Sequence, residues 1–146
     1  MIAIIDYGVG NLFSLKSSFA AIGVETAVTG DPEAIRRADR LILPGVGAFG
    51  DAAALLRRNG LDQVVRQEAE DGKPLLGICL GMQLLFDYGL EYGRHQGLGL
   101  IPGSVRPIAD YIPAGYKVPH IGWNALRFPA GKPVSPLFRH IREGEC

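Results

Sequence analysis

The stretch LLGICLGMQLLF, residues 75–86, joins a short apolar run to a helical pattern through a turn with glycine on both sides. The run Leu75–Ile78 is typical of a strand that is buried on both faces. The apolar spacing that follows predicts a helix over residues 80–88, with Leu80, Leu84, Leu85 and Tyr88 on one face. A Gly-x-Cys-x-Gly turn between strand and helix is the pattern of a nucleophile elbow, with Cys79 in the place of serine.

The chemistry of such an elbow requires these residue types. The sharp turn strains the backbone of the nucleophile and lifts its side chain above the sheet, so the positions two residues away, Gly77 and Gly81, must be small. A helix that begins at Leu80 favours the thiolate, and the Leu80 N–H can serve one side of an oxyanion hole. The alternative is that Cys79 is a buried structural cysteine that packs as a small apolar side chain.

Strands and helices alternate along the first part of the chain. Ile2–Ile5 and Leu41–Leu43 are further apolar runs, and Val24–Val28 is a weaker one. Helical patterns lie between the strands, at residues 12–22, 32–38, 52–58 and 61–69. This order predicts an α/β fold with a doubly wound, mostly parallel sheet and flanking helices.

The composition changes after Gly89, where frequent glycines and prolines interrupt the apolar patterns and leave only short segments between them. We expect short strands near Leu100, near Val105 and at Ala125–Phe128. No boundary is strong enough to divide the chain, so residues 1–146 are interpreted as one domain.

Glycine-rich loops follow the first and third predicted strands. Pro44-Gly45-Val46-Gly47 can point peptide N–H groups into the crevice where α/β proteins bind ligands, and it can supply a second oxyanion donor; a plain turn is the alternative. The loop DYGVGN, residues 6–11, lacks the third glycine of a dinucleotide fingerprint and suits contact with a partner better than a nucleotide.

One further segment, VPHIGWN at residues 118–124, contains the only tryptophan of the chain. Its mixture of aromatic, proline and polar residues suits an interface loop, in which a tryptophan is often a hot spot. A tryptophan packed in the core beside a turn is the alternative.

Composition excludes several classes of protein. The 146 residues carry 15 basic and 15 acidic side chains without a basic patch, which argues against nucleic acid as a partner. The longest nearly apolar run is residues 75–86, well short of the ~20 residues of a membrane span, and the N-terminus is not a secretory signal. Cys79 and Cys146 form no disulfide framework, so we expect a cytoplasmic protein. No motif indicates a metal or cofactor.

The segments DYGVGN, PGVGAF, GICLGMQLLF and VPHIGWN, in this order and spacing, closely resemble the glutamine amidotransferase subunits of imidazole glycerol phosphate synthase, which are class I (triad) amidotransferases. The resemblance extends from Met1 to about Phe138. It implies that Cys79 attacks the carboxamide of L-glutamine, giving a glutamyl thioester and ammonia. It assigns the oxyanion hole to Leu80, Val46 and Gly47, and substrate binding to Gln83 and Gly45.

The resemblance also implies a partner. In the family, ammonia passes to a (βα)₈-barrel cyclase subunit that builds the imidazole ring in histidine biosynthesis. The residues expected to face this barrel in a heterodimer are Asn11, Pro119, His120, Trp123 and Asn124.

One departure from the family pattern concerns the catalytic triad. The family completes the triad with His and Glu in an H-P-E motif, whereas His95, His120 and His140 are not followed by Pro-Glu. We therefore expect a C-terminally truncated fragment that lacks the last strands, is marginally stable and has no useful turnover. Two alternatives are a cysteine α/β hydrolase of the intracellular-peptidase kind and a non-catalytic binding subunit on the same scaffold.

Overall fold

The structure is a computed structural model that describes residues 1–145; Cys146 lies outside the described residues. The chain divides into two compact units, Met1–Asp110 and the segment from Tyr111 onward.

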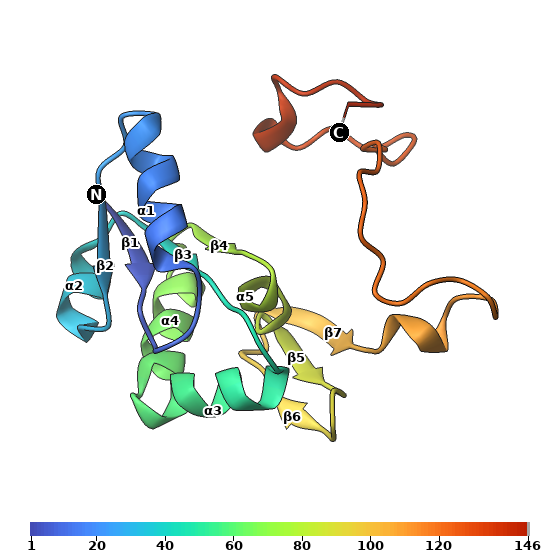
Figure 1. The fold of residues 1–146 in the computed structure, drawn as a ribbon. Coiled ribbons are helices and arrows are strands. Elements are labelled where there is room, and N and C mark those ends of the chain that lie inside the picture. The colour runs from blue at the N-terminus through green and yellow to red at the C-terminus, as the bar shows by residue number, and fades with distance from the viewer. Residues whose placement is uncertain (146) are drawn as a thin grey trace. The chain divides into compact units, whose positions relative to one another are not determined.

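The first unit is built on a four-stranded parallel sheet in the order β2-β1-β3-β4 (Figure 1). The strands are β1 (Ile2–Ile5), β2 (Thr26–Thr29), β3 (Arg40–Leu43) and β4 (Leu75–Gly77). Leu43 is in register with Gly77, so the loops that follow β3 and β4 leave the same edge of the sheet side by side. The predicted parallel sheet is confirmed.

Helices lie on both faces of this sheet (Figure 1). They are α1 (Leu12–Ala21), α2 (Pro32–Arg37), α3 (Phe49–Arg58) and α4 (Leu61–Glu70). The core lies on the face of α2, α3 and α4, where alternate residues of β1 and β3 meet the buried stripes of these helices; it includes Ala3, Ile5, Leu41, Leu43, Ile35, Phe49, Leu56, Leu61 and Val65. The helix α1 lies on the other face and contains no buried residue.

The helix predicted over residues 80–88 is wrong beyond its first turn. The helix α5 covers only Leu80–Gln83, and Phe86–Gly89 forms strand β5. The reason is competition for backbone acceptors: the carbonyl oxygens of Leu84 and Leu85 accept N–H groups of Leu98 and Leu100, each at 2.8 Å, which a continuing helix would need for itself.

Strand β5 is the centre of a second, three-stranded sheet in the order β6-β5-β7. It pairs antiparallel with β6 (His95–Gln96) and parallel with β7 (Ile101–Val105). The predicted short strands near Leu100 and Val105 are therefore confirmed as one strand, β7.

The unit from Tyr111 onward has little regular structure. The predicted strand at Ala125–Phe128 does not form. Leu126 exchanges backbone hydrogen bonds with Glu145 and Gly144 at 2.9 and 3.0 Å, and the pairing extends no further within residues 1–145. A 3₁₀ turn at Pro136–Phe138 brings the rings of Phe128 and Phe138 to 5.6 Å. Trp123 is 89% exposed, so the alternative of a core tryptophan is wrong.

Strand β4 is an edge of its sheet among the described residues, and its Leu76 is 52% exposed. Within residues 1–145, none of the helices is long and apolar enough to cross a membrane.

Candidate active site

Cys79 has the backbone conformation expected of a nucleophile elbow. Its φ of 55° and ψ of −119° lie where side chains other than glycine are rarely found, at a typical cost of ~1–3 kcal/mol. The turn is held by the Ile78 N–H, which donates to the Leu43 carbonyl at 3.0 Å, and by the Gly81 N–H, which donates to the Ile78 carbonyl at 3.0 Å. Cys79 is exposed, so the alternative of a buried structural cysteine is wrong.

The two glycines of the elbow are required by close backbone contacts. A Cβ on Gly77 would lie 2.5 Å from the Met82 Cα. A Cβ on Gly81 would overlap the Leu43 carbonyl oxygen and lie 2.6 Å from its carbon. The start of α5 therefore presses directly on the ends of β3 and β4, and only glycine allows that approach.

The loop after β3, residues 44–48, is called the oxyanion loop here, after the role that the sequence predicts for it. Val46 is 52% exposed, and Gly47 has a φ of +94° with open space around its Cα. No acceptor within residues 1–145 takes the N–H of Leu80 or of Gly47. These N–H groups are available to a ligand oxygen.

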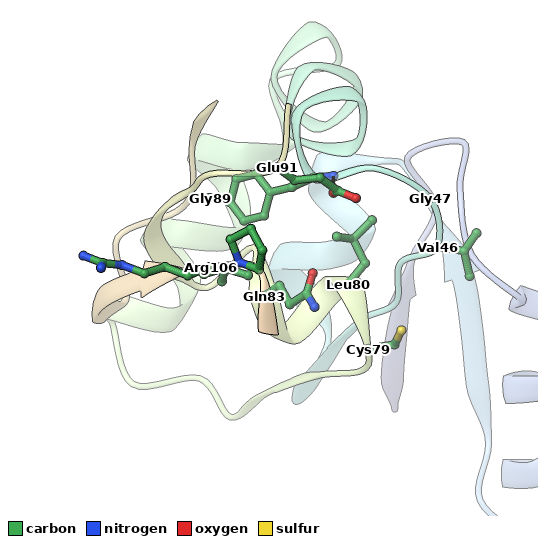
Figure 2. A pocket seen from close by; sticks show the side chains of 11 residues that line it. Val46, Gly47, Cys79, Leu80, Gln83, Gly89, Glu91 and Arg106 are labelled. Atoms are coloured by element: carbon green, nitrogen blue, oxygen red, sulfur yellow. Dashed lines mark hydrogen bonds between the residues drawn. The ribbon is translucent and has the colours of Figure 1, made fainter. Parts of the chain in front are cut away.

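Cys79 lines a cleft of about 320 Å³. Figure 2 shows Cys79 and Val46 at one end and Arg106 at the other, with Gln83 and Glu91 between them. Five residues predicted from the sequence are thus brought to one cleft: Val46, Gly47, Cys79, Leu80 and Gln83. Gly45 is not among its lining residues; it is buried, and a Cβ there would lie 2.7 Å from the Gly81 nitrogen and 2.9 Å from the Leu80 Cβ.

Glu91 and Arg106 are cleft residues that the sequence did not indicate. The Glu91 Oε2 accepts the Phe49 N–H at 2.8 Å, so this carboxylate caps α3, whose own N-cap residue Ala48 makes no side-chain bond. Arg106 follows β7 and donates from Nε to the Ser104 hydroxyl at 3.0 Å. No local motif marks either residue, because each reaches the cleft through the second sheet.

Tyr7 lies behind the oxyanion loop. Its side chain is 1% exposed, and its hydroxyl donates to the Pro44 carbonyl oxygen at 2.8 Å. Burial raises the pKa of Tyr7 to about 12, so its hydroxyl keeps its proton at neutral pH.

The histidines do not supply a partner for Cys79 in the first unit. His95 lies against Gly50 at the start of α3 and is not a lining residue of the cleft. In the second unit, His120 Nε2 and Asn124 Nδ2 are 2.9 Å apart. Among the described residues, no group of three or more His, Cys, Asp or Glu side chains is placed to hold a metal ion.

The residues predicted to face a partner fall in both units. In the first, Asn11 caps α1 by accepting the Ser14 N–H at 3.2 Å. In the second, Pro119, His120, Trp123 and Asn124 are all exposed.

The chain is similar to known glutamine amidotransferases. The model of the CobB/CobQ-like glutamine amidotransferase domain matches residues 3–110. A crystal structure of a glutamine amidotransferase superposes with a TM-score of 0.65 at 24% identity, covering 81% of this chain and 60% of the other. This likeness confirms the predicted fold class.

Curated relatives carry the name imidazole glycerol phosphate synthase subunit HisH. The protein of Sulfurimonas denitrificans is 51% identical over 127 residues, covering 86% of this chain and 61% of the relative. That of Moorella thermoacetica is 52% identical over 143 residues, covering 98% and 65%.

A third relative, from Geobacillus kaustophilus, is 50% identical over 146 residues, covering 99% of this chain and 68% of the relative. The chain thus spans about two thirds of the length of the relatives it matches. It belongs to the glutamine amidotransferase family, within the group of imidazole glycerol phosphate synthase HisH subunits.

Proposed function

We propose that the protein is the glutaminase subunit of an imidazole glycerol phosphate synthase and acts in the cytoplasm in histidine biosynthesis. The observation that carries this proposal is the strained elbow of Cys79, which opens on a cleft shared with Val46, Gly47, Leu80 and Gln83. A cysteine α/β hydrolase would need the same elbow, but the HisH relatives favour the amidotransferase.

The first chemical step is attack of the Cys79 thiolate on the carboxamide carbon of glutamine. A C–S bond forms, and the carbonyl electrons move onto the oxygen, which the N–H groups of Leu80, Val46 and Gly47 stabilise. Collapse of this intermediate breaks the C–N bond; the nitrogen takes a proton and leaves as ammonia. Water then attacks the thioester and releases glutamate, which frees the Cys79 sulfur again.

Three polar side chains of the cleft are suited to the rest of the substrate. Gln83 lies one turn after Cys79 and can hydrogen-bond the glutamine. The Glu91 carboxylate and the Arg106 guanidinium carry the charges that complement an α-amino and an α-carboxylate group. We assign these roles as part of the proposal, with Gly45 supporting the site by its close contact with the elbow.

The proton donor for ammonia belongs to the same proposal. The family uses the histidine of an H-P-E motif, and residues 1–146 contain none. The proposal requires such a general acid, and none of His95, His120 and His140 is assigned this role. Ammonia then passes to the (βα)₈-barrel cyclase, which docks on Asn11 and on residues 119–124.

Affinity labelling tests the glutaminase proposal. A chloroketone analogue of L-glutamine should alkylate Cys79, with loss of chloride, much faster than iodoacetamide does, and L-glutamine should protect. Gln83→Ala should remove this preference while it leaves the iodoacetamide rate unchanged. Peptide mapping that finds the chloroketone only on Cys146, or equally on both cysteines, would overturn the proposal and favour a non-catalytic subunit.

A further inference from the structure

Tyr7 joins the loop after β1 to the oxyanion loop after β3. Its buried hydroxyl donates to the Pro44 carbonyl oxygen at 2.8 Å, across 37 positions of sequence. A second contact comes from Gly10, where a Cβ would lie 3.1 and 3.2 Å from the Cβ and Cγ of Pro44. Pro44 is therefore held at its carbonyl and at its ring by the same short segment, residues 7–10.

The Tyr7 bond fixes the first peptide of the oxyanion loop. A peptide unit is planar and trans, so holding the Pro44 carbonyl also fixes the direction of the Gly45 N–H, which points the opposite way within the same plane. Gly45 also has little room toward the elbow, because a Cβ built on it would lie 2.7 Å from the Gly81 nitrogen and 2.9 Å from the Leu80 Cβ. The loop is thus constrained up to Gly45.

The other end of the loop is fixed as well. The Phe49 N–H donates to Glu91 Oε2 at 2.8 Å. Between these two anchors, Val46 is half exposed and Gly47 has open space around its Cα. The peptides on either side of Val46, which carry the N–H groups of Val46 and Gly47, lie between these two anchors and are held by neither of them.

We propose that Tyr7 is a positioning residue for the oxyanion hole, which anchors the Pro44 end of the loop so that the Val46 and Gly47 N–H groups face the oxygen held above Cys79. The inference rests on the proposed function. Oxyanion donors act only when they lie ~2.7–3.1 Å from the developing charge. Without the Tyr7 hydroxyl, one more peptide can rotate, and a smaller fraction of molecules holds the donors in place.

The test is Tyr7→Phe, which keeps the buried ring and removes only the hydroxyl. The substrate is the p-nitrophenyl γ-ester of L-glutamate. Its leaving group departs as the nitrophenolate anion and therefore needs no proton from a histidine. At saturating ester, we expect Tyr7→Phe to slow acylation of Cys79 about tenfold, the effect of losing one ordinary hydrogen bond. The half-saturating ester concentration and the rate of alkylation by iodoacetamide should stay unchanged.

Tyr88→Phe is the matched control, because Tyr88 lies outside the cleft and its hydroxyl has no partner among the described residues; it should acylate like the wild type. Cys79→Ala gives the rate of spontaneous ester hydrolysis, which is subtracted from the rates of the other variants. Unchanged acylation in Tyr7→Phe would overturn the inference, as would a parallel fall in iodoacetamide reactivity, which would indicate a packing role.

Failure of the proposed function gives a different result. If the wild type forms no glutamyl thioester at Cys79, the glutaminase proposal fails, and Tyr7 is then judged by hydrogen exchange of the Val46 and Gly47 amides, measured by NMR. Faster exchange at these two amides in Tyr7→Phe, against unchanged exchange in Tyr88→Phe, supports the anchor. Equal exchange in both variants overturns it.

Discussion

Replacing Gly81 by alanine should distort the turn at Cys79 more than a glycine-to-alanine replacement anywhere else in residues 1–110. The new Cβ would lie 2.6 Å from the Leu43 carbonyl carbon and 2.9 Å from the Pro44 carbonyl carbon. Ordinary contacts begin at 3.4 Å, so the start of α5 and the end of β3 must separate by at least about 0.8 Å, and the Leu43 carbonyl oxygen lies closer still. Both partners are backbone atoms, which cannot turn aside as a flexible side chain would.

The cost of this separation should lie at the upper end of the range for overpacking, about 3 kcal/mol of unfolding free energy. For a chain of this length, that corresponds to a fall in melting temperature of roughly 10 °C. The measurement is urea unfolding followed by circular dichroism, with Gly122→Ala as the control, since a Cβ on Gly122 meets no atom within 4 Å. The same displacement turns Cys79 away from the cleft and should abolish its preference for the chloroketone over iodoacetamide.

A Gly81→Ala protein as stable as Gly122→Ala, with the labelling preference intact, would refute the reasoning. It would mean that the elbow tolerates a side chain at this position and that the contact between α5 and β3 is not what holds Cys79 in its strained conformation.

Three further predictions follow from other parts of the structure. Glu91→Ala should lower the unfolding free energy by about 1 kcal/mol, because it removes the carboxylate that caps α3. Glu91→Gln keeps a side-chain oxygen at this position and should retain most of the wild-type stability. Equal stability of the two variants in urea would contradict the capping role. Burial raises the pKa of Tyr7 from 10.0 to about 12, so the folded state favours the neutral phenol. This preference contributes about 2–3 kcal/mol of unfolding free energy, which is fully present below pH 10 and should be lost as the pH rises from 10 to 12. Tyr7→Phe should flatten that part of the pH–stability curve, and an equally steep curve would argue against burial as the cause. In a complete subunit, Trp123→Ala should weaken binding to the cyclase barrel by about 30-fold or more in a titration, and unchanged affinity would remove Trp123 from the interface.

The parallel sheet could be predicted because β1, β3 and β4 come from short, contiguous apolar runs with glycine close behind them, whereas β2 had the weaker pattern. Cys79 and the oxyanion loop were predictable for the same reason: the position of each is set by the strand just before it. The elbow in particular depends on contacts between Gly77, Gly81 and their immediate neighbours, and such local constraints are visible in the sequence.

The second sheet could not be predicted in the same way. Leu84, Leu85 and Tyr88 fit a helical spacing, but their segment is decided by hydrogen bonds to residues 97–101, which periodicity does not reveal. Glu91 was missed because its role depends on a bond to Phe49, 42 positions earlier in the chain. The strand predicted at Ala125–Phe128 failed because, within residues 1–145, Leu126 alone among these residues pairs its backbone with another segment.

The exposure of Trp123 gives the protein a built-in optical probe. Because it is the only tryptophan and 89% exposed, its fluorescence should resemble that of indole in water, with emission at long wavelength and ready quenching by iodide or acrylamide. Denaturation of the first unit should be nearly silent in this signal. Any molecule that covers residues 119–124 should instead shift the emission to the blue and shield it from quenchers, so complex formation can be followed by intrinsic fluorescence without a label.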